Sequence, residues 1–287
     1  DLILAEPDRL SPAEFAKLFS GEPQLAPLTA KASELPSNDA RLASALANAP
    51  SVLGLAGESA SDRPPPPPRA RFATAGDDPL QFVPRFSGTV EGLAERTAAA
   101  GGLGAVKWLP ERDQVVRRVP LLLSIAGTLY PSLPLETLRV ALNETTLFVR
   151  SSGGSSVTAF GQRTGIEHVR VGQTVLPTDG DGELWLRFTR PDARRYISAH
   201  RVLDCALDAK EVAGRDILVG TSAVGLLDLR ATPLDSAVPG VEVHAQALEQ
   251  MLNGDHLSRP PFATGLELVY LVVAGAALAW LIGRLGA

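Results

Sequence analysis

The chain has 287 residues, 45% of them apolar and 21% charged, and its formal net charge is −5. This length can bury one large hydrophobic core or two small ones, and the composition is ordinary for a globular protein. The acidic balance, without a clustered basic run, excludes the usual electrostatic footprint of nucleic-acid binding. No nucleic-acid partner is therefore expected, and the arginine pairs at 117–118 and 194–195 are interpreted as solvated charges. The single cysteine, Cys205, excludes an intrachain disulfide.

The first hundred residues predict short helices and strands with proline-rich connections. Apolar residues at helical spacing predict a helix over 39–49, and residues 52–56 predict a buried strand. The five consecutive prolines within 62–69 cannot donate backbone hydrogen bonds, so an extended, exposed loop is expected there. Residues 89–100 predict an amphipathic helix, and residues 103–108 predict the strand that follows it.

The middle of the chain predicts a strand, a helix and an insertion. Residues 114–125 predict one long strand, which Pro120 places at an edge or a bulge, and residues 126–127 turn it back on itself. Residues 131–142 predict a helix. Residues 146–165, with a Ser/Gly tract, predict a flexible insertion.

The next elements complete the predicted fold class. Residues 168–177 predict a hairpin, residues 178–182 a turn, and residues 183–188 a strand, with a helix after Ser198. Strands and helices mix throughout the chain, which predicts an α/β fold: a mixed β-sheet flanked by helices.

The last polar segment is the most informative one. Residues 216–220 have the pattern of a short buried strand, and residues 221–233 form a polar loop. Residues 241–252 predict a helix that Asn253 and Gly254 stop. We expect its apolar face to pack on the sheet; this face comprises Val241, Ala245, Leu248 and Leu252, with Val243, Ala247 and Met251 beside them.

An apolar run closes the sequence. No charge interrupts it from Leu268 to Gly283, Tyr270 lies near one end and Trp280 near the other. About 20 residues cross a bilayer. A buried core helix is the alternative, but small residues and flanking aromatic residues favour a membrane helix over residues 266–282.

These features predict a polar domain joined directly to a membrane. We expect an extracytoplasmic domain over residues 1–263 and a transmembrane helix over residues 264–287, with Arg284 favouring a cytoplasmic C-terminus. The chain starts at Asp1, and residues 1–5 resemble the end of a buried strand. It is therefore expected to be a fragment of a longer protein.

One serine has the surroundings of a nucleophile at first sight. Ser222 follows a predicted strand, and Asp228 and His244 follow it in the chain order of an α/β-hydrolase triad. The second glycine of the motif, Gly225, falls one residue late, and the spacing to His244 leaves no room for the intervening elements. A tight turn is the favoured interpretation, and a membrane-anchored hydrolase is kept as an alternative, beside a structural envelope protein.

Metal and cofactor sites have little support in the sequence. The histidines show no ligand spacing and no companion cysteines. Residues 179–183 have calcium-loop composition but lack the twelve-residue ligand set, which favours a hairpin turn. No metal and no cofactor are therefore predicted, and His244 is expected to be a packed, hydrogen-bonded residue.

A polar loop is the stronger candidate for a ligand site. Asp228, Arg230 and Thr232 place a carboxylate, a guanidinium and a hydroxyl just beyond a predicted strand. Open α/β sheets bind ligands at such strand ends. The alternative is an internal ion pair that pins the loop.

Three blocks carry a resemblance to a known family. The first is residues 1–9, which contain Glu6 and Asp8, and the second is residues 109–120 with 129–133. The third comprises residues 218–228, 232–233 and 239–247, which contain Asp228, Thr232 and His244. Together they resemble a CHASE domain of the second type, over roughly residues 1–260.

The resemblance implies a function and a location. It implies an extracytoplasmic sensory domain of a bacterial inner-membrane receptor without catalysis in this chain, controlling a cytoplasmic adenylate or guanylate cyclase, or else a kinase. It also implies one membrane span before the domain and about three after it, a homodimer, and an unidentified small-molecule or environmental stimulus. Glu6, Asp8 and His244 join the loop residues as candidate signalling residues on this basis.

Overall fold

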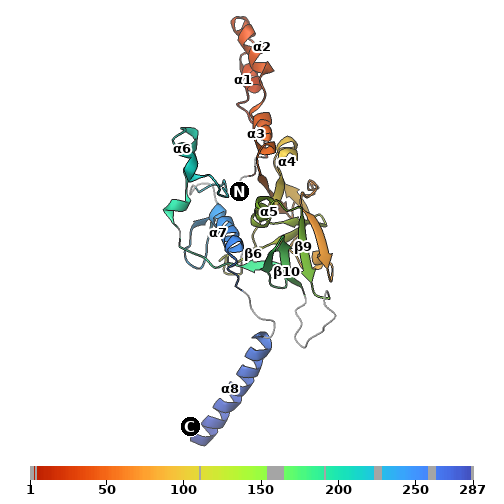
Figure 1. Cartoon of the computed structure of the whole chain (residues 1–287), viewed down its shortest axis with the longest axis vertical. Coiled ribbons are helices and arrows are strands. Elements are labelled where there is room, and N and C mark those ends of the chain that lie inside the picture. The colour runs from red at the N-terminus through yellow and green to blue at the C-terminus, as the bar shows by residue number, and fades with distance from the viewer. Residues whose placement is uncertain are drawn as a thin grey trace.

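The computed structural model describes residues 3, 5–109, 111–153, 165–190, 192–222, 228–257 and 263–285. Figure 1 shows a central body, a narrow helical arm that extends from it, and a separate C-terminal helix at the opposite end. The arm contains α1 (Pro12–Leu18), η1 (Pro23–Leu25), α2 (Ala26–Glu34) and α3 (Asn38–Ala47). The predicted helix at 39–49 is thereby confirmed as α3, whereas α1 and α2 were not predicted.

Mixed β-sheets form the body. Their strands are β1 (Val52–Glu58), β2 (Arg71–Ala75), β3 (Arg85–Phe86), β4 (Gly88–Val90), β5 (Gly102–Ala105), β6 (Arg118–Pro120), β7 (Leu122–Ile125), β8 (Thr128–Pro131), β9 (Thr146–Ser151), β10 (Ile166–Val171), β11 (Thr174–Pro177), β12 (Glu183–Trp185), β13 (Leu229–Arg230) and β14 (Val238–Pro239). The sheet orders are β4-β1-β5, β11-β10-β9-β2, β3-β7-β8, β12-β6 and β13-β14. The β1/β5, β2/β9 and β3/β7 pairs are parallel, and the other pairs are antiparallel.

The remaining helices include two that pack in the core of the body and a C-terminal one that stands apart from it. In chain order the remaining helices are η2 (Pro79–Gln81), α4 (Ala94–Ala99), α5 (Leu133–Ala141), η3 (Ala193–Arg195), α6 (Ala199–Leu203), η4 (Ala209–Glu211), α7 (Gly240–Asn253) and α8 (Ala263–Leu285). The predicted fold class, mixed sheet with flanking helices and a C-terminal apolar helix, is confirmed. The sheet is nevertheless divided into small units, and not one continuous layer.

The largest core cluster joins α5 and α7 to the strands around β9 and β10. Leu135 and Leu138 of α5 pack with Val243, Ala247 and other α7 residues in this cluster. A second cluster lies between β1, β5, β7 and β8 and includes Tyr130. The Tyr130 hydroxyl donates to the carbonyl oxygen of Pro66, so the proline-rich segment is tied to the body and not wholly exposed.

Several predicted elements are shorter or different. The strand predicted over 114–125 is divided into β6 and β7, which belong to different sheets, because Leu121 donates its N–H to Gly182 and not to a strand partner. The helix predicted over 89–100 begins only at Ala94, since residues 88–90 form β4 against β1.

Two further sequence predictions are wrong in part. Residues 146–151, predicted as the start of a flexible insertion, form β9 in the middle of a sheet; residues 154–164 of that insertion lie outside the described residues. Residues 216–220 form no strand, and Ile217 and Val219 are 59% and 64% exposed. Their apolar character therefore does not reflect burial. Most of the strand end predicted at residues 1–5 also lies outside the described residues.

The helix predicted over 241–252 is confirmed as α7, but its buried face is different. Val243, Ala247, Leu248 and Met251 are buried, whereas Leu252 is 49% exposed, and Val241 and Ala245 are only partly buried. The helix ends at Gly254, whose φ of 71° suits glycine at this position. We call residues 254–257, which follow it, the connector.

The last helix, α8, stands apart from the body in Figure 1. Within it, Gly265–Arg284 is long and apolar enough to cross a membrane, and none of this stretch is buried against the rest of the chain. The alternative of a buried core helix is thus wrong. That α8 crosses a membrane stays a prediction.

A close backbone approach fixes α5 against β5. A Cβ at Gly104 would lie 2.5 Å from the Leu133 Cα, at the first residue of α5. We predict that Gly104→Ala lowers the free energy of unfolding by about 1–3 kcal/mol, because the backbone must shift to admit the methyl group. Urea unfolding of the chain in detergent measures this change. Gly21→Ala, where no atom lies within 4 Å of the added carbon, is the matched control, and an equal effect in both variants would contradict the packing argument.

Candidate functional site

The candidate ligand residues Asp228 and Arg230 line a cleft of about 700 Å³. Its lining also includes Ile3, Ala56, residues 106–108, which follow β5, Gln114 and Thr221. The cleft therefore lies where β5 ends, beside the N-terminal end of α7. This is the kind of position that open α/β sheets use for ligands.

Asp228 connects the cleft to α7. Its backbone carbonyl accepts the Gly240 N–H at 2.8 Å, and a Cβ at Gly240 would lie 2.5 Å from the Asp228 Oδ2. The carboxylate thus fills the space beside the first residue of α7. A negative charge there is favourable, because the N-terminus of a helix carries a partial positive charge.

Arg230 faces the same carboxylate. Its Nη2 lies 3.1 Å from the Asp228 Oδ1, and the guanidinium is partly exposed. In the part of the chain that the structure describes, its Nε is buried and makes no hydrogen bond. The partly exposed end of a guanidinium beside a cleft suits a carboxylate or another anionic group. The two readings of this loop, ion pair and ligand site, are thus geometrically compatible.

Thr232 has a different position. Its hydroxyl donates to the backbone oxygen of Asp235 and accepts the N–H of the same residue, and its own N–H also bonds that oxygen. Thr232 is buried. Its side chain therefore closes the turn after Arg230 and holds the loop in shape.

His244 lies beneath the cleft and not in its opening. Its ring stacks on Trp108 with the centroids 3.8 Å apart, and the residue is only 1% exposed. Burial lowers the pKa of His244 well below its ordinary value, with the Asp228 carboxylate acting against this effect. The imidazole is accordingly neutral near pH 7, and its packing agrees with the sequence prediction.

The hydrolase alternative gains nothing from this geometry. A general base must reach the nucleophile and the substrate, but the His244 ring is enclosed between Trp108 and the core. Residues 223–227, which follow Ser222, lie outside the described residues. Ser222 therefore has no support as a catalytic residue.

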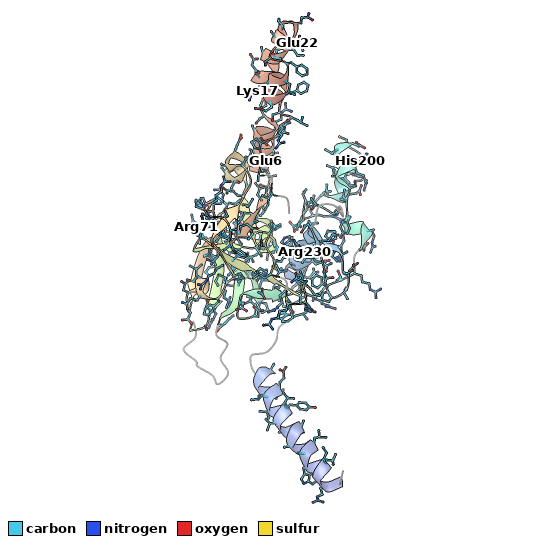
Figure 2. All side chains as sticks on the ribbon, turned by 180° about the vertical axis from the view of Figure 1, so that it is seen from behind. Glu6, Lys17, Glu22, Arg71, His200 and Arg230 are labelled. Atoms are coloured by element: carbon cyan, nitrogen blue, oxygen red, sulfur yellow. The ribbon has the colours of Figure 1, made fainter. Side chains whose placement is uncertain are left out.

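Glu6 and Asp8 lie at the base of the helical arm, and Figure 2 shows Glu6 well away from Arg230. The Glu6 side chain pairs with Arg9 on the surface. Asp8 accepts hydrogen bonds from Ser11 and from the Asn38 amide at 2.6 Å. The Asn38 bond, with others, lowers the pKa of Asp8. The structure therefore brings Ile3 of the first block to the cleft, but not the acidic residues Glu6 and Asp8.

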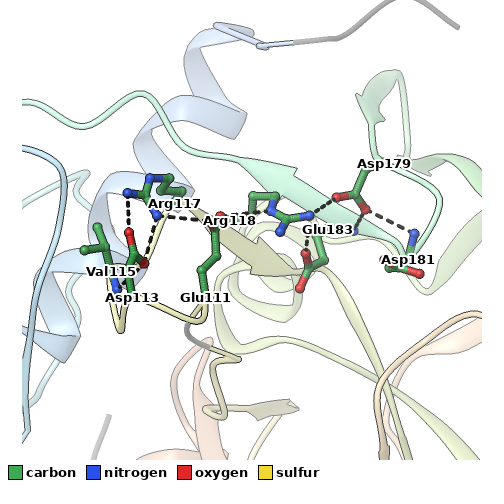
Figure 3. A network of polar contacts seen from close by, with 8 residues as sticks. All are labelled: Glu111, Asp113, Val115, Arg117, Arg118, Asp179, Asp181 and Glu183. Carbon is green, nitrogen blue, oxygen red and sulfur yellow. Dashed lines mark hydrogen bonds and ion pairs between the residues drawn. The ribbon is translucent and has the colours of Figure 1, made fainter. Parts of the chain in front are cut away.

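Sequence reasoning missed a second polar cluster, shown in Figure 3. Arg118 pairs with Asp179 at 2.9 Å and with Glu183 at 3.1 Å, and its guanidinium lies over the Trp185 ring. Arg117 pairs with Asp113 and Glu111. The interpretation of Arg117 and Arg118 as solvated charges is wrong, because both hold carboxylates together. The sequence signal for this cluster is the set of arginine and acidic residues at 111–118 together with the acidic residues at 179–183.

Clustered carboxylates can bind a metal ion. Among the described residues, no set of three or more His, Cys, Asp or Glu side chains is placed to hold a metal ion. Asp179 Oδ1 instead accepts the N–H groups of Asp181 and Glu183, which makes the predicted turn. These contacts make residues 179–183 a turn, but it joins β11 and β12 of different sheets, so the predicted hairpin turn is wrong.

Comparison with known proteins agrees with the family resemblance. The family model described as the CHASE2 domain matches residues 1–282. Neither the curated proteins nor the solved structures contain a significant match.

The position of Asp228 generates a testable prediction. We expect Asp228→Ala to lower the free energy of unfolding by about 1–2 kcal/mol, because it removes both the charge beside the α7 N-terminus and the Arg230 ion pair. Arg230→Ala should cost less, since it leaves that carboxylate in place. Urea unfolding followed by circular dichroism provides the measurement. Asp216→Ala, at an exposed aspartate in the segment leading to the cleft, is the control. Equal stability of the Asp228 and Asp216 variants would disprove the role of Asp228.

Proposed function

Because the chain belongs to the CHASE2 family, whose members are extracellular sensory domains of signalling receptors, we propose that it is the input part of a membrane-bound bacterial receptor. Residues 1–263 form the extracytoplasmic sensory domain, and residues 264–287 contain a transmembrane helix in the inner membrane. The output is a cytoplasmic adenylate or guanylate cyclase, and the full-length receptor acts as a homodimer. The whole proposal depends most on α8, an unburied apolar helix that follows the domain directly.

The stimulus in this proposal is a small molecule with an anionic group. The support is the cleft beside Asp228 and Arg230, where the Arg230 guanidinium is partly exposed. A ligand that competes with Asp228 for Arg230 would change the charge beside the first turn of α7. Binding can shift a two-state equilibrium only by its difference in affinity for the two states, and this contact supplies such a difference.

The route from the cleft to the membrane is α7. Its side chains Val243, Ala247 and Met251 belong to the largest core cluster, so its displacement must repack the core. At its C-terminal end the connector is held: Leu257 pairs with Trp185 of β12, and Arg187 lies 3.7 Å from Asp255. A shift of α7 would therefore act on the connector, which is attached to β12 and leads toward α8.

Membrane topology gives the first test. A reporter fused after Ala287, in a protein with its preceding span present, should report a cytoplasmic position, because Arg284 follows the apolar run. Periplasmic reporter activity would contradict the orientation. Recovery of the chain in the soluble fraction would contradict the span itself, and with it the receptor proposal.

Coupling through the connector gives the second test. Inserting a short Gly/Ser segment after Gly254 should leave the domain folded but weaken the response of the output to the stimulus, because α7 can then move without moving α8. Cyclase activity of the full-length receptor is the measurement. The same insert after Gly21, in an exposed turn of the arm, is the control. A normal response with the Gly254 insert would show that coupling follows another route.

A further inference from the structure

Glu183 lies in a cluster that contains more carboxylates than cations. The residue is only 8% exposed, and its Oε2 lies 3.1 Å from the Arg118 Nη1. The same guanidinium lies 2.9 Å from the Asp179 Oδ2 and 3.4 Å from the Glu111 Oε1. Figure 3 shows this one guanidinium between the three carboxylates. It can neutralise only one of their charges.

The other charged groups around Glu183 do not restore the balance. Asp181, in the turn before β12, adds negative charge, and Arg117 pairs with Asp113 and Glu111. Burial raises the pKa of Glu183 to about 7, Asp179 adds to this effect, and Arg118 opposes it. The Glu183 carboxyl therefore takes up a proton near neutral pH.

The strand that carries Glu183 also holds the connector. Trp185 lies two residues after Glu183 in β12. The Arg118 Cζ lies over its ring, 4.9 Å from the ring centroid. The Trp185 carbonyl accepts a hydrogen bond from Gln250 of α7 at 2.7 Å, and Leu257 of the connector pairs with Trp185. The cluster, α7 and the connector thus meet at one residue.

We propose that Glu183 is a proton-binding site whose occupancy controls how firmly β12 holds the connector. Glu183 would thus make the proton a second stimulus of the receptor. This inference rests on the proposed function only in its claim that the connector leads into a membrane helix. No catalytic step is involved.

The direction of the effect follows from linkage. The folded pKa of Glu183 lies above its unfolded value of 4.5. The stability that the neutral carboxyl contributes is fully present below about pH 4.5 and is lost as the pH rises through about 7. Ionised Glu183 adds an uncompensated charge beside Asp179, so opening of β12 becomes easier. Acid should therefore tighten β12 on the connector, and alkali should loosen it.

Hydrogen exchange of the complete 287-residue chain in lipid nanodiscs tests this proposal. We expect opening at residues 183–189 and at residues 254–257 to increase between pH 5 and 7, by at most about tenfold per pH unit after correction for intrinsic exchange chemistry, and then to level off. Glu183→Gln, which stays neutral, should abolish this increase in both segments. Asp181→Asn, which removes a charge from the exposed side of the same turn, should keep the increase but move its midpoint to lower pH.

Each contrary result overturns a defined part of the proposal. An increase that persists in Glu183→Gln would show that another group binds the proton. An increase confined to residues 183–189 would show that the connector is not coupled. If Glu183→Gln does not fold, an unmoved midpoint in Asp181→Asn overturns the proposal. Because these readouts use no signalling output, their failure is separate from a failure of the topology test.

Discussion

The polar flank of α7 is the interaction on which the rest of the domain depends. After Leu186, whose N–H still donates to the Arg117 carbonyl, the chain continues through residues 187–190 without a strand partner in the described structure, yet its backbone groups face the core helix. Gln250 accepts the Arg187 N–H at 2.7 Å and donates to the Trp185 carbonyl, and Gln246 makes the same pair of bonds with the N–H and carbonyl of Thr189. Two side-chain amides thus replace a neighbouring strand, since buried backbone polar groups must be satisfied.

This arrangement makes α7 a common element for two sides of the domain. Its N-terminal end is held by Asp228 in the cleft, and its C-terminal half is held by the segment that follows the acidic cluster. Glu242 accepts from Gln246 and lies within 3.3 Å of Arg195, so the polar flank is paired along its length. A helix fixed by hydrogen bonds on one flank and by close packing on the other moves as a unit. Small changes at either end are therefore transmitted along it.

Periodicity predicted the existence and bounds of α7 but not its orientation. The predicted stripe of Val241, Ala245, Leu248 and Leu252 has the correct spacing, yet only Leu248 of the four is buried. The buried side of the helix instead includes Glu242, Gln246 and Gln250. Hydrophobicity alone predicts that a leucine is buried before a glutamine. The glutamines are buried here because they bond backbone groups at residues 185–189, which come from a distant part of the chain. Arg118 of β6 was misread for the same reason, because its partners Asp179 and Glu183 lie more than sixty residues away in the sequence. The α8 helix was predictable, since its length and lack of charge are local properties.

The two candidate inputs differ in how they affect α7, and this difference constrains any mechanism. A ligand at Arg230 changes the charge beside the N-terminus of α7. The electrostatic effect of such a charge falls off within the first turn of the helix. A proton at Glu183 acts on the stability of a strand that contacts both α7 and the connector. If both bias the same displacement of α7, thermodynamic linkage requires that each also alters the affinity for the other. The pKa of Glu183 should then depend on whether the cleft is filled, although no charged group of the cleft touches Glu183 in the described structure. A ligand-dependent midpoint would place the coupling in α7, because this helix joins the two sites.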